Sequence, residues 1–136
     1  LDRVRSRHDT TSFLEAVIHL TSGVRKTGGS SNPVWFLWEP ELDSLLVYST
    51  STARRLAHIK ARPRVSAHLN SDASGRDILI LTGNAETATD APAANTNPAY
   101  LAKYSTDIDR IGSTPERFGY HFSEALRLRI HHARGI

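Results

Sequence analysis

The chain has 136 residues and contains neither cysteine nor methionine. Without cysteine it forms no disulfide, holds no cysteine-ligated zinc and carries no thiolate nucleophile. This absence is typical of a cytoplasmic protein, which is the location we expect. Because methionine is missing even at position 1, we expect the native start to lie upstream. Residues 1–9 are charged and polar, unlike the apolar centre of a signal peptide.

Long apolar runs are also missing. No stretch approaches the roughly 20 apolar residues that a transmembrane helix needs, so we expect no membrane partner. Apolar residues make up 39% of the chain and charged residues 23%, values typical of globular domains. The length fits one domain. We therefore predict a single domain over 1–136, with 1–8 as a flexible N-terminal segment.

Acidic residues are absent between Asp43 and Asp72, in a chain of net charge +3. The same window holds five Lys and Arg residues, which are Arg54, Arg55, Lys60, Arg62 and Arg64. Such a block favours an anionic partner: a phosphate, a polycarboxylate or a nucleic acid. The charge is concentrated at one predicted helix and lacks interleaved aromatic residues, so we do not expect nucleic acid.

Several enzyme and metal signatures are missing. The seven histidines show no HExxH pattern and no paired spacing with carboxylates, so we expect no metal site. The sequence also lacks the Gly-x-Ser-x-Gly elbow of serine hydrolases and the Walker loop of nucleotide hydrolases.

Residue periodicity predicts about six antiparallel strands and a few short helices. The predicted strands cover Val17–Lys26, Ser30–Trp38, Leu45–Ser49, Arg64–Asn70, Asp77–Glu86 and Ala125–His132. The predicted helices cover His8–Ala16, Thr52–Ala61, Pro98–Tyr104 and Thr114–His121. Short strands without a strand–helix–strand rhythm favour an antiparallel barrel.

Three finer predictions concern burial. The continuous apolar run in Asp77–Glu86 predicts a strand buried on both faces. Alternation near the C-terminus predicts that Leu126 and Leu128 face inward and that Arg127 faces outward. The segment Thr89–Pro98, rich in Ala, Pro, Asn and Thr, predicts a surface loop.

The stretch from Trp35 to Leu69 carries the most chemistry. A strand ending at Ser49 leads through a tight turn into a helix that begins with Arg54 and Arg55. A helix N-terminus offers unpaired N–H groups, and arginines are bidentate phosphate donors. The pattern predicts a phosphate site beside an aromatic strand; an ordinary helix cap, with Trp35 and Trp38 as core residues, is the alternative.

The runs PVWFLW, LLVYSTSTARRLAHIKARPRVSAHL and DILILTGNAE resemble the pyridoxamine 5′-phosphate oxidase-like superfamily of FMN-binding split barrels. They are similar in particular to its actinobacterial branch of F-420-dependent oxidoreductases. The later segments YLAKY, STPERF and LRLRIHHARG are also similar to that branch. The resemblance extends from Phe13 to the end of the chain.

The resemblance implies a mainly β, split-barrel fold that forms a homodimer with cofactor sites at the subunit interface. It implies that the cofactor phosphate lies beside Tyr48, Ser49, Arg54 and Arg55. It implies that the ring system lies beside Val34, Trp35, Phe36 and Leu37, largely against their backbone groups. No side chain serves uniformly as a catalytic acid or base in this group, because the cofactor performs the hydride chemistry.

The function implied is an oxidoreductase that binds the deazaflavin coenzyme F-420 and transfers hydride to or from a small organic substrate. Two alternatives stay open, an FMN-dependent oxidase or reductase and a non-catalytic protein that binds a cofactor or haem. The sequence departs from the family pattern at two turns. The turn at 27–32 is shorter than usual, and the turn at 39–44 is longer and contains Pro40.

Overall fold

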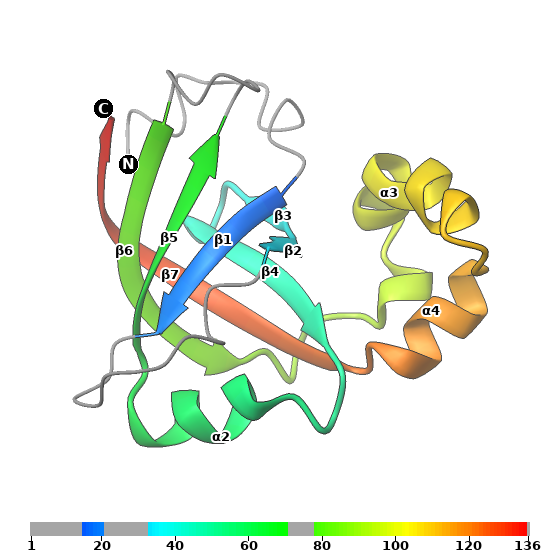
Figure 1. The fold of residues 1–136 in the computed structure, drawn as a ribbon, viewed down its shortest axis with the longest axis horizontal. Coiled ribbons are helices and arrows are strands. Elements are labelled where there is room, and N and C mark those ends of the chain that lie inside the picture. Colours follow the sequence, from blue (N-terminus) through cyan, green and yellow to red (C-terminus); the bar gives the residue numbers. More distant parts are fainter. Residues whose placement is uncertain (1–14, 21–32, 71–77, 136) are drawn as a thin grey trace.

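The computed structural model describes residues 15–20, 33–70 and 78–135 (Figure 1). Its strands are β1 (Glu15–Leu20), β2 (Pro33–Trp35), β3 (Leu37–Glu39), β4 (Ser44–Ser49), β5 (Arg64–Asn70), β6 (Ile78–Thr87) and β7 (Glu124–Gly135). They form one seven-stranded sheet in the order β2-β1-β5-β6-β7-β4-β3, and every neighbouring pair is antiparallel. The predicted mainly β fold with a few short helices is confirmed.

The sheet closes into a barrel through its two end strands. β2 pairs with β1 and β3 pairs with β4, although only Phe36 separates β2 from β3 along the chain. The strand predicted over Ser30–Trp38 is therefore divided, and its halves bind opposite edges of the sheet; residues 30–32 lie outside the described residues. With β2 and β3 taken as one divided strand, the count agrees with the prediction of about six.

β4 separates two hydrophobic clusters, because all six of its residues are buried. Leu45 and Val47 point into the barrel, whereas Leu46 and Tyr48 point to the opposite face. The barrel cluster consists of Phe36, Leu45, Val47, Ile59, Val65, Ala67, Leu69, Leu81, Ala85, Leu126, Leu128 and Ile130. Burial of this apolar surface is the main force that favours the fold.

Helix α2 (Arg54–Ala61) covers one end of the barrel and contributes Ile59 to its core (Figure 1). A 3-10 helix η2 (Ala94–Thr96) and the helices α3 (Pro98–Arg110) and α4 (Pro115–His121) form a lobe beside the barrel (Figure 1). Thr114 caps α4, because its side chain accepts a hydrogen bond from the Arg117 N–H.

Two helix predictions need correction. Glu15 and Ala16, placed in an N-terminal helix, belong to β1, where Ala16 pairs with both β2 and β5; residues 8–14 of that prediction lie outside the described residues. α3 extends to Arg110 rather than ending at Tyr104, because Ile108 continues the buried row of its inner face.

Two predictions about burial were wrong. Described residues of β6 alternate between buried and exposed, with Leu81 buried and Glu86 exposed, so the strand is not buried on both faces. The outer face of the barrel wall is open to water there. The segment predicted as a surface loop, Thr89–Pro98, contains η2 and buries Ala94 and Asn97, because both residues pack beneath the lobe.

Arg127 is the largest departure from the predicted pattern. It points away from the barrel core as the alternation requires, yet it is only 3% exposed. Its guanidinium binds both carboxylate oxygens of Glu39, at 2.8 and 3.1 Å, and Asp90 at 2.7 Å. These partners lie on β3 and on the segment before the lobe, so Arg127 ties the barrel wall to the start of the lobe.

Candidate functional site

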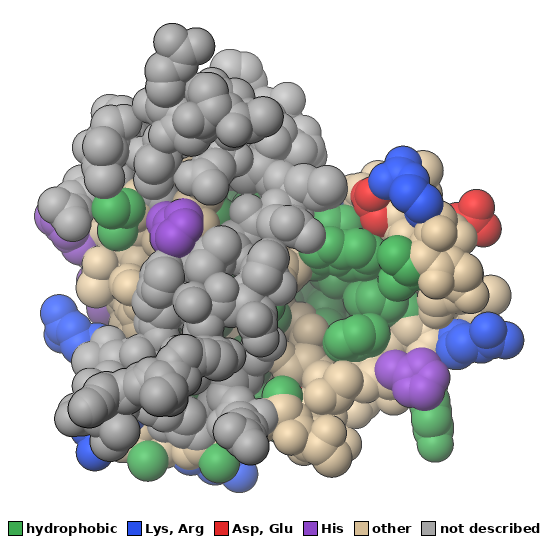
Figure 2. Space-filling model, viewed as in Figure 1, with side chains coloured by type: hydrophobic (Ala, Val, Ile, Leu, Met, Phe, Trp, Pro, Cys, Tyr) green, Lys and Arg blue, Asp and Glu red, His purple; other side chains and the backbone are tan. Residues whose placement is uncertain are grey.

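A pocket of about 350 Å³ lies between the barrel and the helical lobe. Figure 2 shows hydrophobic side chains gathered in this hollow. The lining residues come from β2, β4, the turn before α2, and the lobe, and they are Val34, Trp35, Tyr48, Ser49, Thr50, Ala53, Tyr100, Ile111, Phe118 and Phe122. The strands and the turn were predicted from the sequence to lie at the site. The lobe helices, which also line the pocket, were not.

One end of the pocket is aromatic. The ring of Trp35 stacks on Tyr104 at 4.7 Å and on Phe118 at 5.6 Å, with interplanar angles of 6° and 13°. Phe118 in turn stacks on Phe122 at 4.4 Å. Trp35 is half-buried at the edge of the second hydrophobic cluster, and Trp38 is half-buried against the barrel core. This second cluster, here called the lobe cluster, consists of Leu46, Tyr48, Ala88, Ala94, Tyr100, Tyr104, Ile108 and Phe118. The nearly parallel rings give this end flat walls that suit a planar ring system.

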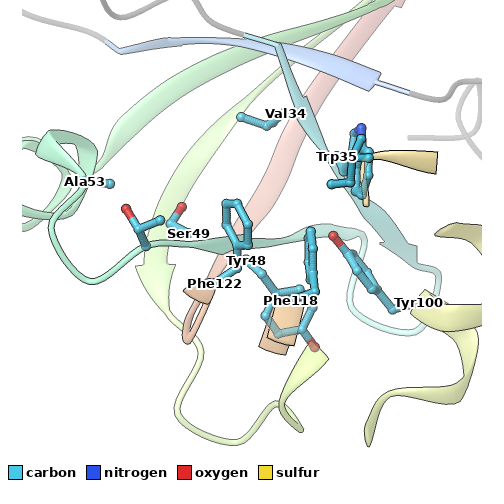
Figure 3. Close-up of a pocket in the computed structure, with 10 residues that line it drawn as sticks. Val34, Trp35, Tyr48, Ser49, Ala53, Tyr100, Phe118 and Phe122 are labelled. Carbon is cyan, nitrogen blue, oxygen red and sulfur yellow. The ribbon is translucent and has the colours of Figure 1, made fainter. Parts of the chain in front are cut away.

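The other end of the pocket is polar and centres on Ser49. This residue is 4% exposed, and its Oγ has no hydrogen-bond partner among the described residues. A buried hydroxyl without a partner costs about 1–3 kcal/mol, so native proteins rarely keep one without a use. Figure 3 shows Ser49 beside Ala53, at the end of the pocket away from Trp35. Ser49 therefore presents a buried hydroxyl in the pocket wall that has no hydrogen-bond partner among the described residues.

α2 begins directly after Ala53, so its N-terminus lies at this polar end of the pocket. Arg54 and Arg55 open the helix, and the structure describes their backbone but not their side chains. Their predicted role at a phosphate stays a prediction. A helix N-terminus carries partial positive charge and free N–H groups, which complement an anion near Ser49.

The hydroxyl of Tyr48, predicted to lie by the phosphate, is already engaged within the chain. It donates a hydrogen bond to the Pro92 carbonyl at 2.7 Å and accepts one from Asn97 Nδ2 at 3.0 Å. Burial raises the pKa of Tyr48, although the Asn97 hydrogen bond opposes this shift. The Tyr48 ring packs edge-on against Tyr100 at 4.8 Å and lines the pocket. The structure thus places this residue in the pocket wall through its ring.

The four predicted ring-binding residues are divided between two environments. Val34 and Trp35 line the pocket, Phe36 lies fully buried in the barrel core, and Leu37 packs against the lobe cluster. The break between β2 and β3 leaves Phe36 outside both strand ladders. Its N–H donates to Tyr104 Oη at 2.9 Å, and its carbonyl accepts from Lys103 Nζ and Tyr104 Oη. Helix α3 therefore occupies the backbone groups at the centre of this segment.

Sequence reasoning missed the lobe residues Tyr100, Ile111, Phe118 and Phe122. A signal for part of this set exists, because Tyr100, Tyr104 and Ile108 repeat at helical spacing and form the buried face of α3. Nothing in that spacing shows that the face packs over β2 and β4.

A second, open depression adjoins the first and shares Thr50 with it. It measures about 650 Å³ and is lined by Thr50, Ser51, Thr52, Gly119, Tyr120, His121 and Ser123. Four of these residues carry aliphatic hydroxyls, so this depression is more polar than the aromatic pocket.

Within 15–20, 33–70 and 78–135, no three His, Asp or Glu side chains gather closely enough to hold a metal ion. No helix in the same ranges has the length and apolar character needed to cross a bilayer.

No family model and no curated protein matches the chain. Solved structures do match it over nearly its whole length. A Clostridium acetobutylicum protein related to general stress protein 26, of the pyridoxinephosphate oxidase family, has a TM-score of 0.62 and 12% identity, covering 98% of this chain and 86% of that one.

Two other solved structures give the same result. A FAD-binding protein from Mesorhizobium loti has a TM-score of 0.64 and 15% identity, covering 99% of this chain and 92% of that one. A conserved hypothetical protein from Mycobacterium tuberculosis has a TM-score of 0.71 and 10% identity, with coverages of 99% and 84%. At these identities the similarity shows the fold alone, a split barrel that the chain shares with this protein of the pyridoxinephosphate oxidase family from Clostridium acetobutylicum.

Proposed function

We propose that the pocket binds a flavin-type redox cofactor, with its phosphate at Ser49 and its ring system against the aromatic lobe. The observation that carries this proposal is the buried Ser49 Oγ, which lacks a partner in the described part of the chain and lines the pocket. A phosphate oxygen would accept its hydrogen bond, and the N-terminus of α2 would add charge complementarity.

The remaining surroundings fit the same ligand. The stacked rings of Trp35 and Phe118 give this end of the pocket flat aromatic surfaces, which suit a planar ring system. The exposed basic residues Lys60, Arg62 and Arg64 follow along α2 and into β5, and no acidic residue offsets them between 44 and 71. When bound, the cofactor supplies the hydride chemistry, and the residues of this chain hold and orient it.

The second depression favours coenzyme F-420 over FMN. F-420 continues beyond its phosphate as a phosphodiester with a polyglutamate tail, whereas FMN ends in a phosphate monoester. The hydroxyls of Thr50, Thr52 and Ser123, together with His121, line a space that begins where the phosphate site ends. We therefore propose an F-420-dependent oxidoreductase that transfers hydride to or from a small organic substrate.

FMN is the second candidate ligand. The observation in its favour is the shared fold with a FAD-binding protein and with a member of the pyridoxinephosphate oxidase family. The same Ser49 and the same aromatic walls would hold its phosphate and its ring. Tight binding of either cofactor without hydride transfer to any tested acceptor would instead indicate a binding protein.

We further propose that a second copy of the chain covers the open side of the pocket. Ile111 and Tyr120 are 60% and 81% exposed, which is unusual for large apolar side chains, and they line the first and second depressions respectively. We expect a homodimer in sedimentation equilibrium at micromolar concentration. A monomer under those conditions would contradict this part of the proposal.

The phosphate site is tested with Ser49→Ala. A hydrogen bond to a charged group contributes about 1.5–3 kcal/mol, so we expect FMN and F-420 to bind at least tenfold more weakly to the variant. Riboflavin, which lacks the phosphate, should bind the two proteins equally. Removal of an unpartnered buried hydroxyl should not lower the melting temperature.

The matched control is Ser105→Ala, because Ser105 lies exposed on α3 and outside both depressions. It should leave all three affinities unchanged. Equal FMN and F-420 binding by native protein and Ser49→Ala would remove Ser49 from the phosphate site.

A further inference from the structure

Tyr100 holds one fixed position in the pocket wall. It is 1% exposed and packs against Tyr48, Tyr104 and Phe118, with ring centroids 4.8, 5.0 and 6.0 Å away. Its backbone N–H donates to Asn97 Oδ1, the cap of α3. Because the helix start and three rings constrain it, the ring has little freedom to move when a ligand enters.

The hydroxyl of Tyr100 differs from those of its two tyrosine neighbours. Tyr48 Oη binds Pro92 and Asn97, and Tyr104 Oη binds the backbone of Phe36. Among the described residues, by contrast, Tyr100 Oη has no hydrogen-bond partner. Figure 3 shows its hydroxyl end directed toward Trp35 and Phe118, in the pocket that all three residues line.

This hydroxyl is a neutral donor at physiological pH. Burial raises the pKa of Tyr100 well above its ordinary value, and the neighbouring Tyr104 and Tyr48 add to the shift. A proton therefore stays on the oxygen throughout the neutral range. The group can give a hydrogen bond to an acceptor, and it does not serve as a base.

We propose that Tyr100 determines which planar rings the pocket accepts, by donating a hydrogen bond from its hydroxyl to a ring carbonyl. The inference rests on the proposed function and extends it from the phosphate end of the ligand to the ring end. A purely hydrocarbon ring would leave this donor buried and unpaired, which costs free energy. Flavin and deazaflavin rings both carry pyrimidine carbonyls that supply the acceptor.

The test compares Tyr100→Phe, which removes one hydroxyl and keeps the ring, with Ser105→Ala. Ser105 is exposed on α3 and lies outside both depressions, so it provides the control. We expect Tyr100→Phe to weaken the binding of FMN and of F-420 about tenfold, as the loss of one buried hydrogen bond predicts. The binding of riboflavin should weaken by the same factor, because this contact does not involve the phosphate. Ser105→Ala should leave all three affinities unchanged.

A spectroscopic measurement separates a direct contact from a structural effect. Infrared difference spectra of the bound ring should show a carbonyl stretch at higher frequency in Tyr100→Phe than in native protein. If the native protein binds the cofactors, but Tyr100→Phe has the same affinities and the same carbonyl bands, the proposed role of Tyr100 is overturned and the proposed function is not. If native protein binds neither FMN nor F-420, both this inference and the proposed function are overturned.

Discussion

The two faces of β4 show two kinds of hydrophobic cluster. On the inner face, Leu45 and Val47 join a barrel core made almost entirely of aliphatic residues. On the outer face, Leu46 and Tyr48 join a cluster of aromatic residues from α3 and α4. One strand thus supports both clusters, and the alternation of its side chains keeps them separate.

The two clusters differ in chemistry, and we therefore expect the barrel core to contribute mainly to stability and the lobe cluster to contribute to binding. Aliphatic side chains fill the barrel without polar atoms, whereas each tyrosine in the lobe brings a hydroxyl that needs a partner. Tyr48 and Tyr104 find partners within the chain, and Tyr100 faces the pocket. The barrel core therefore mainly sustains the fold, and residues of the lobe cluster line the candidate pocket.

The largest effect that tests this division is expected from Leu81→Ala in the barrel core. Leu81 is fully buried, so the cavity should lower the free energy of unfolding by about 2–5 kcal/mol in urea titrations. Leu101→Ala, a half-buried residue at the edge of the lobe cluster, should cost about 1 kcal/mol. At temperatures where Leu81→Ala and the native protein are both folded, the variant should bind FMN and F-420 with native affinity. A loss of affinity comparable to that of Ser49→Ala would break the comparison.

Arg127→Met tests the connection between the two regions. Removal of the guanidinium leaves the Glu39 carboxylate, only 20% exposed, without its bidentate partner. We expect a loss of about 3 kcal/mol in urea unfolding. The double variant Arg127→Met/Glu39→Leu should recover part of this loss, because it removes the unpaired charge as well. A double variant less stable than Arg127→Met would contradict the account of this ion pair.

The two tryptophans give a smaller and more selective test. Trp35→Leu removes a stacking face of the pocket and should weaken FMN and F-420 about fivefold to tenfold, corresponding to about 1–1.4 kcal/mol. Trp38→Leu, at the edge of the barrel core, should reduce stability and leave the affinities unchanged. Fluorescence titrations measure the affinities, and thermal melts measure stability. Equal losses of affinity in both variants would mean that the aromatic end does not contact the ring.

The smallest expected effect concerns Asp90, whose side chain contacts Arg127 but is largely exposed to solvent. The hydrogen bond from Arg127 lowers the pKa of Asp90 below its ordinary value. A lowered folded-state pKa stabilises the protein above the unfolded-state pKa, and this contribution disappears as pH falls through the folded-state value. Asp90→Asn should therefore be slightly less stable than native protein at pH 7, and the difference should shrink from about pH 4 downward. A stability difference independent of pH would exclude this linkage.

The sequence predicted local periodicity better than the contacts between distant segments. The alternation of Leu126 and Leu128 correctly placed them in the barrel core. The same alternation predicted that Arg127 faces outward, but it could not predict that Arg127 is buried. Its partner Glu39 lies 88 residues away, and no local pattern reveals that contact. Likewise, Tyr104 binds the backbone of Phe36 across 68 residues, and this contact positions the lobe.

The candidate site was predictable only where one short stretch of chain builds it. The strand end at Ser49, the following turn and α2 are contiguous, so residue types alone indicated an anion site. The aromatic end needs α3 and α4 to pack over β2 and β4. That packing depends on the divided strand at Phe36, which nothing in the alternation of the apolar run PVWFLW indicates.

The most direct test of the proposed cofactor site is a parallel titration of native protein, Trp35→Phe and Trp38→Phe with FMN and with F-420. Tryptophan emission and cofactor fluorescence are followed together. The account predicts micromolar or tighter binding of F-420, weaker binding of FMN, and quenching of tryptophan emission that Trp38→Phe retains and Trp35→Phe loses. Failure of both cofactors to bind, or quenching that persists in Trp35→Phe, would contradict a flavin-type site in this pocket.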